Sequence, residues 1–331
     1  MKAINCSRYG SPDVLNLIQV GKPIQKDDEV LIRVLAASIN SYDWRIMRGN
    51  PFPVRFREGL LKPKKNKILG ADVAGIVEAI GKNVKELKIG DEVYGCLSDK
   101  NGDSTYAEYV CAKENEMVIK STSITFEEAA SVPMAAVTAL QGLRDLGHIK
   151  TGQRVLINGA SGGVGTFAVQ IAKSFGAEVT GVCSTQNMDM ARRIGADYVI
   201  DYTQEDFTKN GQRYDLILDV AANHSLSDCR RVLKPNGICA VIGFSNFTHL
   251  IAVLLLGAGK RKNDNKLVGL LTANGNRKND LIFLNQLLET KKIVPIIDGS
   301  YPLNEAVKAF WYFEREHAKG KVVISVSNVN G

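Results

Sequence analysis

The sequence VLINGASGGVG at residues 155–165 joins a short apolar run to a glycine-rich turn, and TFAVQIAKSFGAEVTGV follows it directly. We interpret it as a buried strand ending at Asn158, a turn of small residues, and a helix that Gly165 opens. Backbone N–H groups at such a helix N-terminus favour an anion, and the small residues let the backbone approach a pyrophosphate. In the strict GxGxxG pattern the first position is Ala160, so this turn is a variant. The stretch predicts a nucleotide-binding site, with a structural glycine turn as the alternative.

The hydrophobic periodicity changes near residue 120. Before it, short apolar segments such as Val30–Ala36, Val73–Ile80 and Glu92–Cys96 alternate with glycine-containing turns, which predicts an antiparallel, barrel-like β domain. From Thr125 onward the pattern is helical and then alternates between strand and helix, which predicts a parallel sheet. The expected strands are Val155–Ile157, Val179–Val182, Tyr198–Ile200, Leu216–Val220 and Ile238–Ile242.

The C-terminal tail returns to β character. A helix containing Glu305–Phe313 precedes an apolar segment at Lys321–Val326. We expect this last strand to rejoin the N-terminal domain, which would make that domain discontinuous in sequence. The fold class is therefore α/β, with a β-barrel domain at residues 1–121 and 298–331 and a doubly wound parallel-sheet domain at residues 122–297.

Short motifs occur in a characteristic order along the whole chain. They are GADVAG at 70–75, GDEVYG at 90–95, YAEYV at 106–110, AAVTAL at 135–140, NGASGGVG at 158–165, GADYVIDY at 195–202 and GKVVI at 320–324. In this order the chain resembles the medium-chain dehydrogenase/reductase superfamily, and within it the zinc-free, zeta-crystallin-like quinone oxidoreductases. The resemblance implies a GroES-like catalytic domain, a Rossmann NADP-binding domain and a homodimer.

Composition sets further limits. The chain has 331 residues, of which 45% are hydrophobic and 23% charged, so it can bury a sizeable core in about two domains. Its six cysteines include no CxxC pair, and its N-terminus lacks the apolar segment of a secretory signal. These features predict reduced thiols and a cytoplasmic protein.

The net charge of +7 raises the question of a polyanionic partner. Two basic clusters stand out, Lys62, Lys64, Lys65 and Lys67, and then Lys260, Arg261, Lys262 and Lys266. Neither is interleaved with aromatic residues, so we expect solvated loops and no nucleic-acid binding. Because the second cluster follows the apolar run 250–258, weak peripheral contact with an anionic membrane is left open.

The residues argue against a metal. Zinc alcohol dehydrogenases of the superfamily have a cysteine and a GHE histidine where this sequence has Asn40 and Ala71. A structural zinc site requires four closely spaced cysteines, whereas only Cys96 and Cys111 fall in that region. We therefore predict no metal. Without a Lewis acid the substrate carbonyl must be polarised by hydrogen bonds, which suits a quinone or conjugated ketone.

The resemblance also implies catalytic residues beside the nicotinamide. The candidates are Asn40, Tyr42, Asp43, Arg45 and Thr138. Asn40 is expected to donate its amide to the carboxamide or the substrate oxygen, with a turn-capping role as the alternative. For Tyr42 the choice is between proton donor and packed side chain, and for Thr138 between nicotinamide contact and a hydroxyl bonded to its own helix.

Cofactor choice is predicted from the end of the second Rossmann strand. That strand runs into Cys183, Ser184 and Thr185 with no acid before Asp189, which leaves room for a 2′-phosphate and favours NADPH. A lysine that is frequent in related quinone reductases is replaced here by Asn187, so Arg192 or Arg193 is the substitute. The candidate cofactor-binding residues are Ser161, Gly162, Gly163, Val164, Gly165, Cys183, Ser184, Thr185, Asn187, Arg192, Tyr202, Gly243, Phe244 and Lys321.

These observations together predict an NADPH-dependent, zinc-independent reductase of a quinone or an α,β-unsaturated carbonyl, acting by hydride transfer from nicotinamide C4. An enoyl-thioester reductase is the enzymatic alternative. A nucleotide- or nucleic-acid-binding protein without turnover is the alternative from another class.

Overall fold

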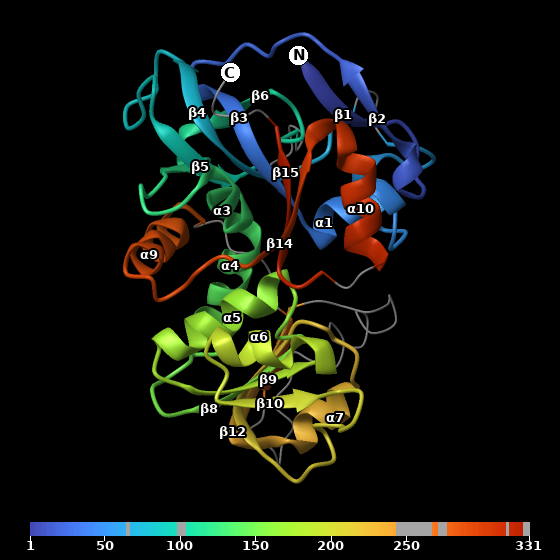
Figure 1. Ribbon diagram of the computed structural model, residues 1–331, viewed down its shortest axis with the longest axis vertical. Coiled ribbons are helices and arrows are strands. Elements are labelled where there is room, and N and C mark those ends of the chain that lie inside the picture. The colour runs from blue at the N-terminus through green and yellow to red at the C-terminus, as the bar shows by residue number, and fades with distance from the viewer. Residues whose placement is uncertain (64–66, 98–103, 243–266, 271–276, 316–317, 327–331) are drawn as a thin grey trace. The chain divides into compact units, whose positions relative to one another are not determined.

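The structure is a computed structural model that describes residues 1–63, 67–97, 104–242, 267–270, 277–315 and 318–326 (Figure 1). The chain forms two compact units. Unit 1 comprises Met1–Met134, Asn276–Glu289 and Pro295–Gly331, and unit 2 comprises Ala135–Gly275 and Thr290–Val294.

Unit 1 is built on a mostly antiparallel sheet with the strand order β14-β15-β3-β4-β5-β7, and β6 also pairs with β3. Its strands are β3 (Glu29–Ile39), β4 (Asp72–Ile80), β5 (Glu92–Cys96), β6 (Tyr109–Lys113), β7 (Met117–Ile119), β14 (Ile297–Pro302) and β15 (Lys321–Ser325). A separate antiparallel pair joins β1 (Lys2–Cys6) to β2 (Leu15–Gln19). Because β15 pairs antiparallel with β3, the C-terminal strand is part of the N-terminal sheet.

The helices of unit 1 are α1 (Ser41–Arg48), α2 (Val54–Glu58), α3 (Phe126–Ser131), α9 (Arg277–Glu289) and α10 (Ala306–Arg315). Helix α3 contacts β3, β4 and β15, so unit 1 extends beyond residue 121, where we predicted the domain boundary. Helix α9 also lies in unit 1, although the predicted boundary assigned it to the second domain. It is attached there because Tyr94 donates to Asn285 Oδ1 (3.0 Å) and Asn285 Nδ2 donates to the carbonyl of Ile119 (2.8 Å).

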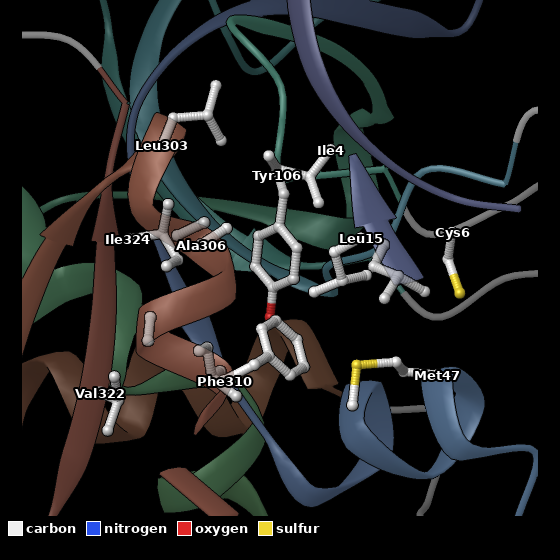
Figure 2. Close-up of a cluster of buried hydrophobic side chains, with 14 of the residues drawn as sticks. Ile4, Cys6, Leu15, Met47, Tyr106, Leu303, Ala306, Phe310, Val322 and Ile324 are labelled. Atoms are coloured by element: carbon white, nitrogen blue, oxygen red, sulfur yellow. The ribbon is translucent and has the colours of Figure 1, made fainter. Parts of the chain in front are cut away.

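One core of unit 1 lies between α10, β15, α1 and the β1–β2 pair (Figure 2). The rings of Tyr106 and Phe310 meet edge to face with their centroids 5.9 Å apart, and both side chains are fully buried. Met47 of α1 and Ile324 of β15 belong to the same cluster. Tyr106 also donates its hydroxyl to the carbonyl of Ser38 (3.2 Å), so this core connects to the polar residues at the end of β3.

Unit 2 contains a parallel sheet with the strand order β10-β9-β8-β11-β12-β13. Its strands are β8 (Arg154–Asn158), β9 (Glu178–Cys183), β10 (Tyr198–Asp201), β11 (Tyr214–Asp219), β12 (Leu233–Val241) and β13 (Leu267–Leu270), and its helices include α5 (Gly163–Ser174), α6 (Met188–Arg193) and α7 (Leu226–Arg231). Helix α4 (Pro133–Gln141) leads into this unit from unit 1. Numbered from β8, the order is 3-2-1-4-5-6, in which ligands bind where the order reverses, between β8 and β11.

The predicted α/β fold class, with a β-rich domain and a doubly wound parallel sheet, is confirmed. One local prediction is wrong: α5 begins at Gly163 rather than Gly165, because Gly162 already has the extended conformation of an N-cap residue. Within the described part of the chain, no helix is both long and apolar enough to span a bilayer.

Candidate functional site

The glycine turn of unit 2 packs directly on the first turn of α5. The N–H groups of Gly159 and Ala160 both donate to the carbonyl of Val182 on β9, at 3.1 and 2.9 Å. A Cβ placed on Gly165 would lie 2.0 Å from the carbonyl oxygen of Gly159. Glycine is therefore required at position 165 because the backbones of turn and helix touch there.

The N-terminus of α5, by contrast, is not crowded at Gly162 by the residues that the structure describes. Apart from the adjoining residues, the nearest described atom to a Cβ on Gly162 would be the Gly159 oxygen, at 3.8 Å. Gly162 is the N-cap and supplies no side-chain cap, and Gly163 and Val164 follow in the first helical turn. The first N–H groups of a helix have no intrahelical acceptor, and the helix dipole favours negative charge beside them. These residues fit a dinucleotide pyrophosphate.

The end of β9 presents hydroxyl groups and a buried thiol. Cys183 is 1% exposed, and burial raises the pKa of its thiol to about 11, so its side chain belongs to the core. Its carbonyl accepts from the N–H of Tyr202 (3.1 Å), whose own side chain is exposed. Ser184 is half-buried and Thr185 is exposed. Of the predicted residues at this strand end, Ser184 and Thr185 are therefore the ones that are not fully buried.

An acid that the sequence reasoning missed lies beside these hydroxyls. In the parallel register of β9 and β10, Asp201 is opposite Cys183. Its carboxylate accepts from the hydroxyl of Thr185 and from the N–H (2.9 Å) and hydroxyl (2.8 Å) of Thr203. The hydrogen bond from Thr185 is the main reason that the pKa of Asp201 is lowered. Asp201 is visible in the VIDY segment at residues 199–202, but only the pairing of β10 with β9 places this acid beside the end of β9.

Asn187 connects the glycine turn to the end of β9. Its side chain is 3% exposed, and its Nδ2 donates to Ser161 Oγ (3.2 Å) and to Ser184 Oγ (3.1 Å). Its Oδ1 is buried and has no hydrogen-bond partner among the described residues. Leaving a buried carbonyl oxygen unsatisfied costs about 1–3 kcal/mol, so this oxygen does not stabilise the fold through a hydrogen bond.

The other predicted cofactor residues of unit 2 make no hydrogen bond to this cluster within the described part of the chain, or they lie outside the described residues. Arg192 is exposed and forms an ion pair with Asp189, one turn earlier on α6, at 3.1 Å. Gly243 and Phe244 lie outside the described residues.

A second polar group missed by the sequence reasoning marks the reversal of strand order in unit 2. Asn158 ends β8 and donates through Nδ2 to Asp219 Oδ1 (2.7 Å), at the end of β11, and to Asn223 Oδ1 (2.9 Å). The N–H of Ala222 also donates to Asp219 Oδ1 (2.9 Å). The sequence signal for this group was a polar residue, Asn158 or Asp219, at the end of each of two apolar strands. The hydrogen bonds of Asn158 and Asp219 fix the loop that follows β11.

In unit 1, Asn40 connects two charged side chains. The Asp43 carboxylate accepts from the N–H of Asn40 (2.8 Å) and so begins helix α1, as an acid at the third helical position commonly does. The Asn40 side chain makes no cap bond. Its Nδ2 donates to Asp72 Oδ2 (2.9 Å) and to the Ser38 carbonyl (3.4 Å), while its Oδ1 accepts from Lys321 Nζ (2.6 Å). Both amide hydrogens are directed into the protein, which differs from the expected donation to substrate or carboxamide.

Asp72 is the centre of this cluster. It is fully buried and also accepts from Ser38 Oγ (3.0 Å) and from the N–H of Met134 (3.0 Å). Lys321 Nζ lies 3.7 Å from Asp72 Oδ2 and donates to the Ile39 carbonyl (3.1 Å). Burial lowers the pKa of the Lys321 ammonium, and the negative charge of Asp72 opposes that shift. The cluster ties the end of β3 to β4, β15 and Met134 in the first turn of α4.

Sequence comparisons place the chain among reductases. Residues 26–124 match the model of the alcohol dehydrogenase GroES-like domain, and residues 194–324 match the model described as zinc-binding dehydrogenase. A 2-methylene-furan-3-one reductase of Solanum lycopersicum is 35% identical, over 98% of this chain and 79% of the relative. An NADPH-dependent alkenal/one oxidoreductase of Arabidopsis thaliana, a chloroplastic protein, is 34% identical over the same two shares.

A solved structure agrees with the sequence comparisons. The quinone oxidoreductase from Coxiella burnetii superposes with a TM-score of 0.85 at 30% identity and covers 99% of both chains. The chain belongs to the medium-chain dehydrogenase/reductase superfamily. The predicted family is thus confirmed, and unit 1 contains the superfamily's GroES-like domain while unit 2 is its Rossmann domain.

The cysteine and histidine that bind zinc in other superfamily members are replaced by Asn40 and Ala71 in this chain. The match to the zinc-binding dehydrogenase model begins at residue 194, so it does not include Asn40 or Ala71. Asn40 Oδ1 already accepts from the Lys321 ammonium, and Ala71 offers no ligand atom. Across the part of the chain that the structure describes, no group of three or more His, Cys, Asp or Glu side chains is arranged to hold a metal ion. These residues do not fit a zinc ion.

The remaining predicted catalytic residues divide between the two units of this superfamily member. Tyr42 lies on α1, half-buried, and packs against the core around Phe310, which favours the packing interpretation. Arg45 is also on α1, and burial lowers the pKa of its guanidinium. Thr138 is half-buried on α4 in unit 2.

Proposed function

We propose that this protein is an oxidoreductase that reduces quinones or α,β-unsaturated carbonyl compounds with NADPH and without zinc. The observation that carries the proposal is the open N-terminus of α5 beside the glycine turn, in a parallel sheet of 3-2-1-4-5-6 order. The named relatives, which reduce an enone, an alkenal or a quinone, support the reaction class.

In this proposal the α5 N-terminus binds the pyrophosphate. The backbone N–H groups that follow Gly162 donate to its oxygens, and the absence of a side chain at Gly162 leaves them accessible. When bound, the dinucleotide supplies a hydride, that is, one hydrogen with its electron pair, to the electron-poor carbon of the substrate. The protein holds the cofactor and substrate in position and supplies hydrogen bonds to the oxygen on which charge develops.

Preference for NADPH is supported by the hydroxyl of Ser184, which suits a 2′-phosphate better than an acid at the end of β9 does. The hydroxyl hydrogen of Thr185 is already donated to Asp201. Asp201 opposes this preference because its charge lies next to Thr185. The carboxylate already accepts from Thr185 and Thr203, which compensates part of that charge.

The buried cluster of unit 1 is proposed to position α1. Asn40, Asp43 and Lys321 fix the first turn of that helix, and with it the backbone that carries Tyr42 and Arg45. We assign Asn40 and Lys321 to positioning rather than to direct contact with substrate or cofactor. Zinc independence follows from the Lys321 ammonium at Asn40 Oδ1, because a cation at the same oxygen would be repelled.

The test is turnover with a substrate panel. Oxidation of NADPH should be rapid with quinones or short enones, slower with NADH as donor, and unaffected by a zinc chelator. Turnover restricted to enoyl thioesters would favour the thioester alternative, and tight NADPH binding with no turnover would favour a binding protein. Stoichiometric zinc in the purified protein would contradict the metal-free proposal. The homodimer, the cytoplasmic location, the absence of nucleic-acid binding and the peripheral membrane contact stay predictions.

A further inference from the structure

Asn187 occupies a helix N-cap position but does not cap its helix. Asparagine is among the preferred N-cap residues because its side-chain oxygen accepts from an N–H of the first turn. Asn187 precedes α6, yet its side chain makes no cap bond. Instead its Nδ2 donates to the hydroxyls of Ser161 and Ser184, and its buried Oδ1 has no partner among the described residues. The side chain therefore bonds to the two serines at the expense of its own helix.

This bonding pattern determines the direction of both hydroxyls. A serine hydroxyl has one hydrogen to donate, and a hydroxyl that accepts from an amide N–H keeps that hydrogen for another acceptor. Within the described part of the chain, neither Ser161 nor Ser184 uses its hydroxyl hydrogen in a bond to protein. Two half-buried hydroxyls are thus left as donors, and donors are what phosphate oxygens require.

The two serines lie at different parts of the expected dinucleotide site. Ser161 belongs to the turn before α5, at the pyrophosphate, whereas Ser184 follows β9, where the adenosine ribose and its 2′-substituent bind. The single amide of Asn187 reaches both because η4 (Thr185–Asn187) turns back toward the glycine turn.

We propose that Asn187 is a positioning residue that sets Ser161 and Ser184 as hydrogen-bond donors, Ser161 to the pyrophosphate and Ser184 to the 2′-phosphate of NADPH. The inference rests on the proposed function, because it assumes that unit 2 binds a nicotinamide dinucleotide. A donor bonds more strongly to a phosphate than to the neutral 2′-hydroxyl of NADH, so Asn187 contributes to cofactor preference without contacting the cofactor.

The experiment is a double-mutant cycle on dinucleotide affinity, measured with the full chain by the fluorescence change of NADPH and NADH on binding. Asn187→Leu removes the amide at similar volume. We expect it to weaken NADPH binding about 10-fold and NADH binding about 3-fold, because each lost oriented donor costs a fraction of a charge-assisted hydrogen bond. In a Ser184→Ala background, Asn187→Leu should weaken both cofactors equally, since only the route through Ser161 remains.

A second variant keeps the inference testable if Asn187→Leu does not fold, which its thermal unfolding midpoint will show. Asn187→Asp offers only acceptors, so both serine hydroxyls should turn inward and the preference for NADPH should fall. Gln186→Glu is the matched control, because it adds the same charge on the neighbouring exposed residue without reaching either serine. We expect the control to reduce the NADPH preference by much less than Asn187→Asp.

The outcomes separate the inference from the proposed function. If the unaltered protein binds neither dinucleotide, the proposed function fails. If it binds both dinucleotides, two results would show that the positioning role of Asn187 is wrong while the proposed function stands. In the first, Asn187→Leu weakens NADPH and NADH binding by the same factor. In the second, the effect of Asn187→Leu on each cofactor is the same in the unaltered protein and in the Ser184→Ala background.

Discussion

The two units each contain a buried polar centre, and the two centres differ in how completely their hydrogen bonds are used. Around Asp72 in unit 1, Ser38, Asn40 and the N–H of Met134 all donate to one carboxylate, and Lys321 balances its charge. Around Asn187 in unit 2, a buried oxygen has no partner in the described chain and two hydroxyls keep their hydrogens. This difference is the basis for our proposal that the first centre is structural and that the second belongs to the cofactor site.

The largest expected effect tests whether the Asp72 centre is structural. Lys321→Met leaves Asp72 buried without its ammonium partner and Asn40 Oδ1 without its donor, which should lower the free energy of unfolding by about 3–5 kcal/mol. Urea unfolding measures this loss, and the double variant with Asp72→Asn should recover much of it. A loss of NADPH affinity at unchanged stability would instead restore Lys321 as a cofactor-binding residue.

The next effect concerns the glycine turn of unit 2. Gly165→Ala forces a methyl group to within 2.0 Å of the Gly159 oxygen, so the turn and α5 must move apart. We expect a loss of about 1–3 kcal/mol in unfolding free energy together with loss of measurable NADPH binding. Thermal unfolding and fluorescence titration report the two quantities.

Gly162→Ala is the counterpart that separates binding from folding. Apart from the adjoining residues, its methyl group would come no closer than 3.8 Å to the described part of the chain, and it would lie at the position proposed for the pyrophosphate. Stability should therefore stay within about 0.5 kcal/mol of the unaltered protein, a typical value for substitutions that strain nothing, while NADPH affinity falls about 10-fold or more. Unchanged affinity would show that the pyrophosphate does not bind at this helix end.

A smaller effect is expected at the acid beside Ser184 and Thr185. Asp201→Asn removes a negative charge that is hydrogen-bonded to Thr185, next to the site proposed for the 2′-phosphate. Because like charges repel only weakly in a solvent-like medium, NADPH affinity should rise roughly 3-fold relative to NADH. The ratio of the two dissociation constants is the readout, and an unchanged ratio would remove Asp201 from the cofactor site.

The smallest effect is on pH stability. Hydrogen bonds, that from Thr185 first, lower the pKa of Asp201 below its ordinary value of 3.8, so the folded state favours the ionised carboxylate. Its contribution to stability is present above about pH 4 and is lost as the pH falls through the lowered pKa. The difference in unfolding midpoint between the unaltered protein and Asp201→Asn should therefore shrink as the pH falls below about 4. A difference that grows on acidification would contradict this assignment.

The strands and the glycine turn were predictable because each depends on local pattern. The apolar run at Val155–Ile157 and the small residues after it are enough to predict strand, turn and helix, although the start of α5 was placed two residues late. Asn158, Asp201 and Asp219 escaped prediction as site residues, because each is a single polar residue closing an apolar strand and its partners are supplied by other strands and loops.

The sequence by itself determined the superfamily, the parallel sheet and the glycine turn before α5, since the order of motifs and the spacing of apolar residues are properties of neighbouring positions. Only the tertiary structure decided how Asn40 and Asn187 are used. Both are asparagines near helix starts, where capping is the common role. Instead, each amide bonds to residues distant in sequence: Asn40 to Asp72 and Lys321, and Asn187 to Ser161. A buried amide bonds to the partners that the fold brings within reach.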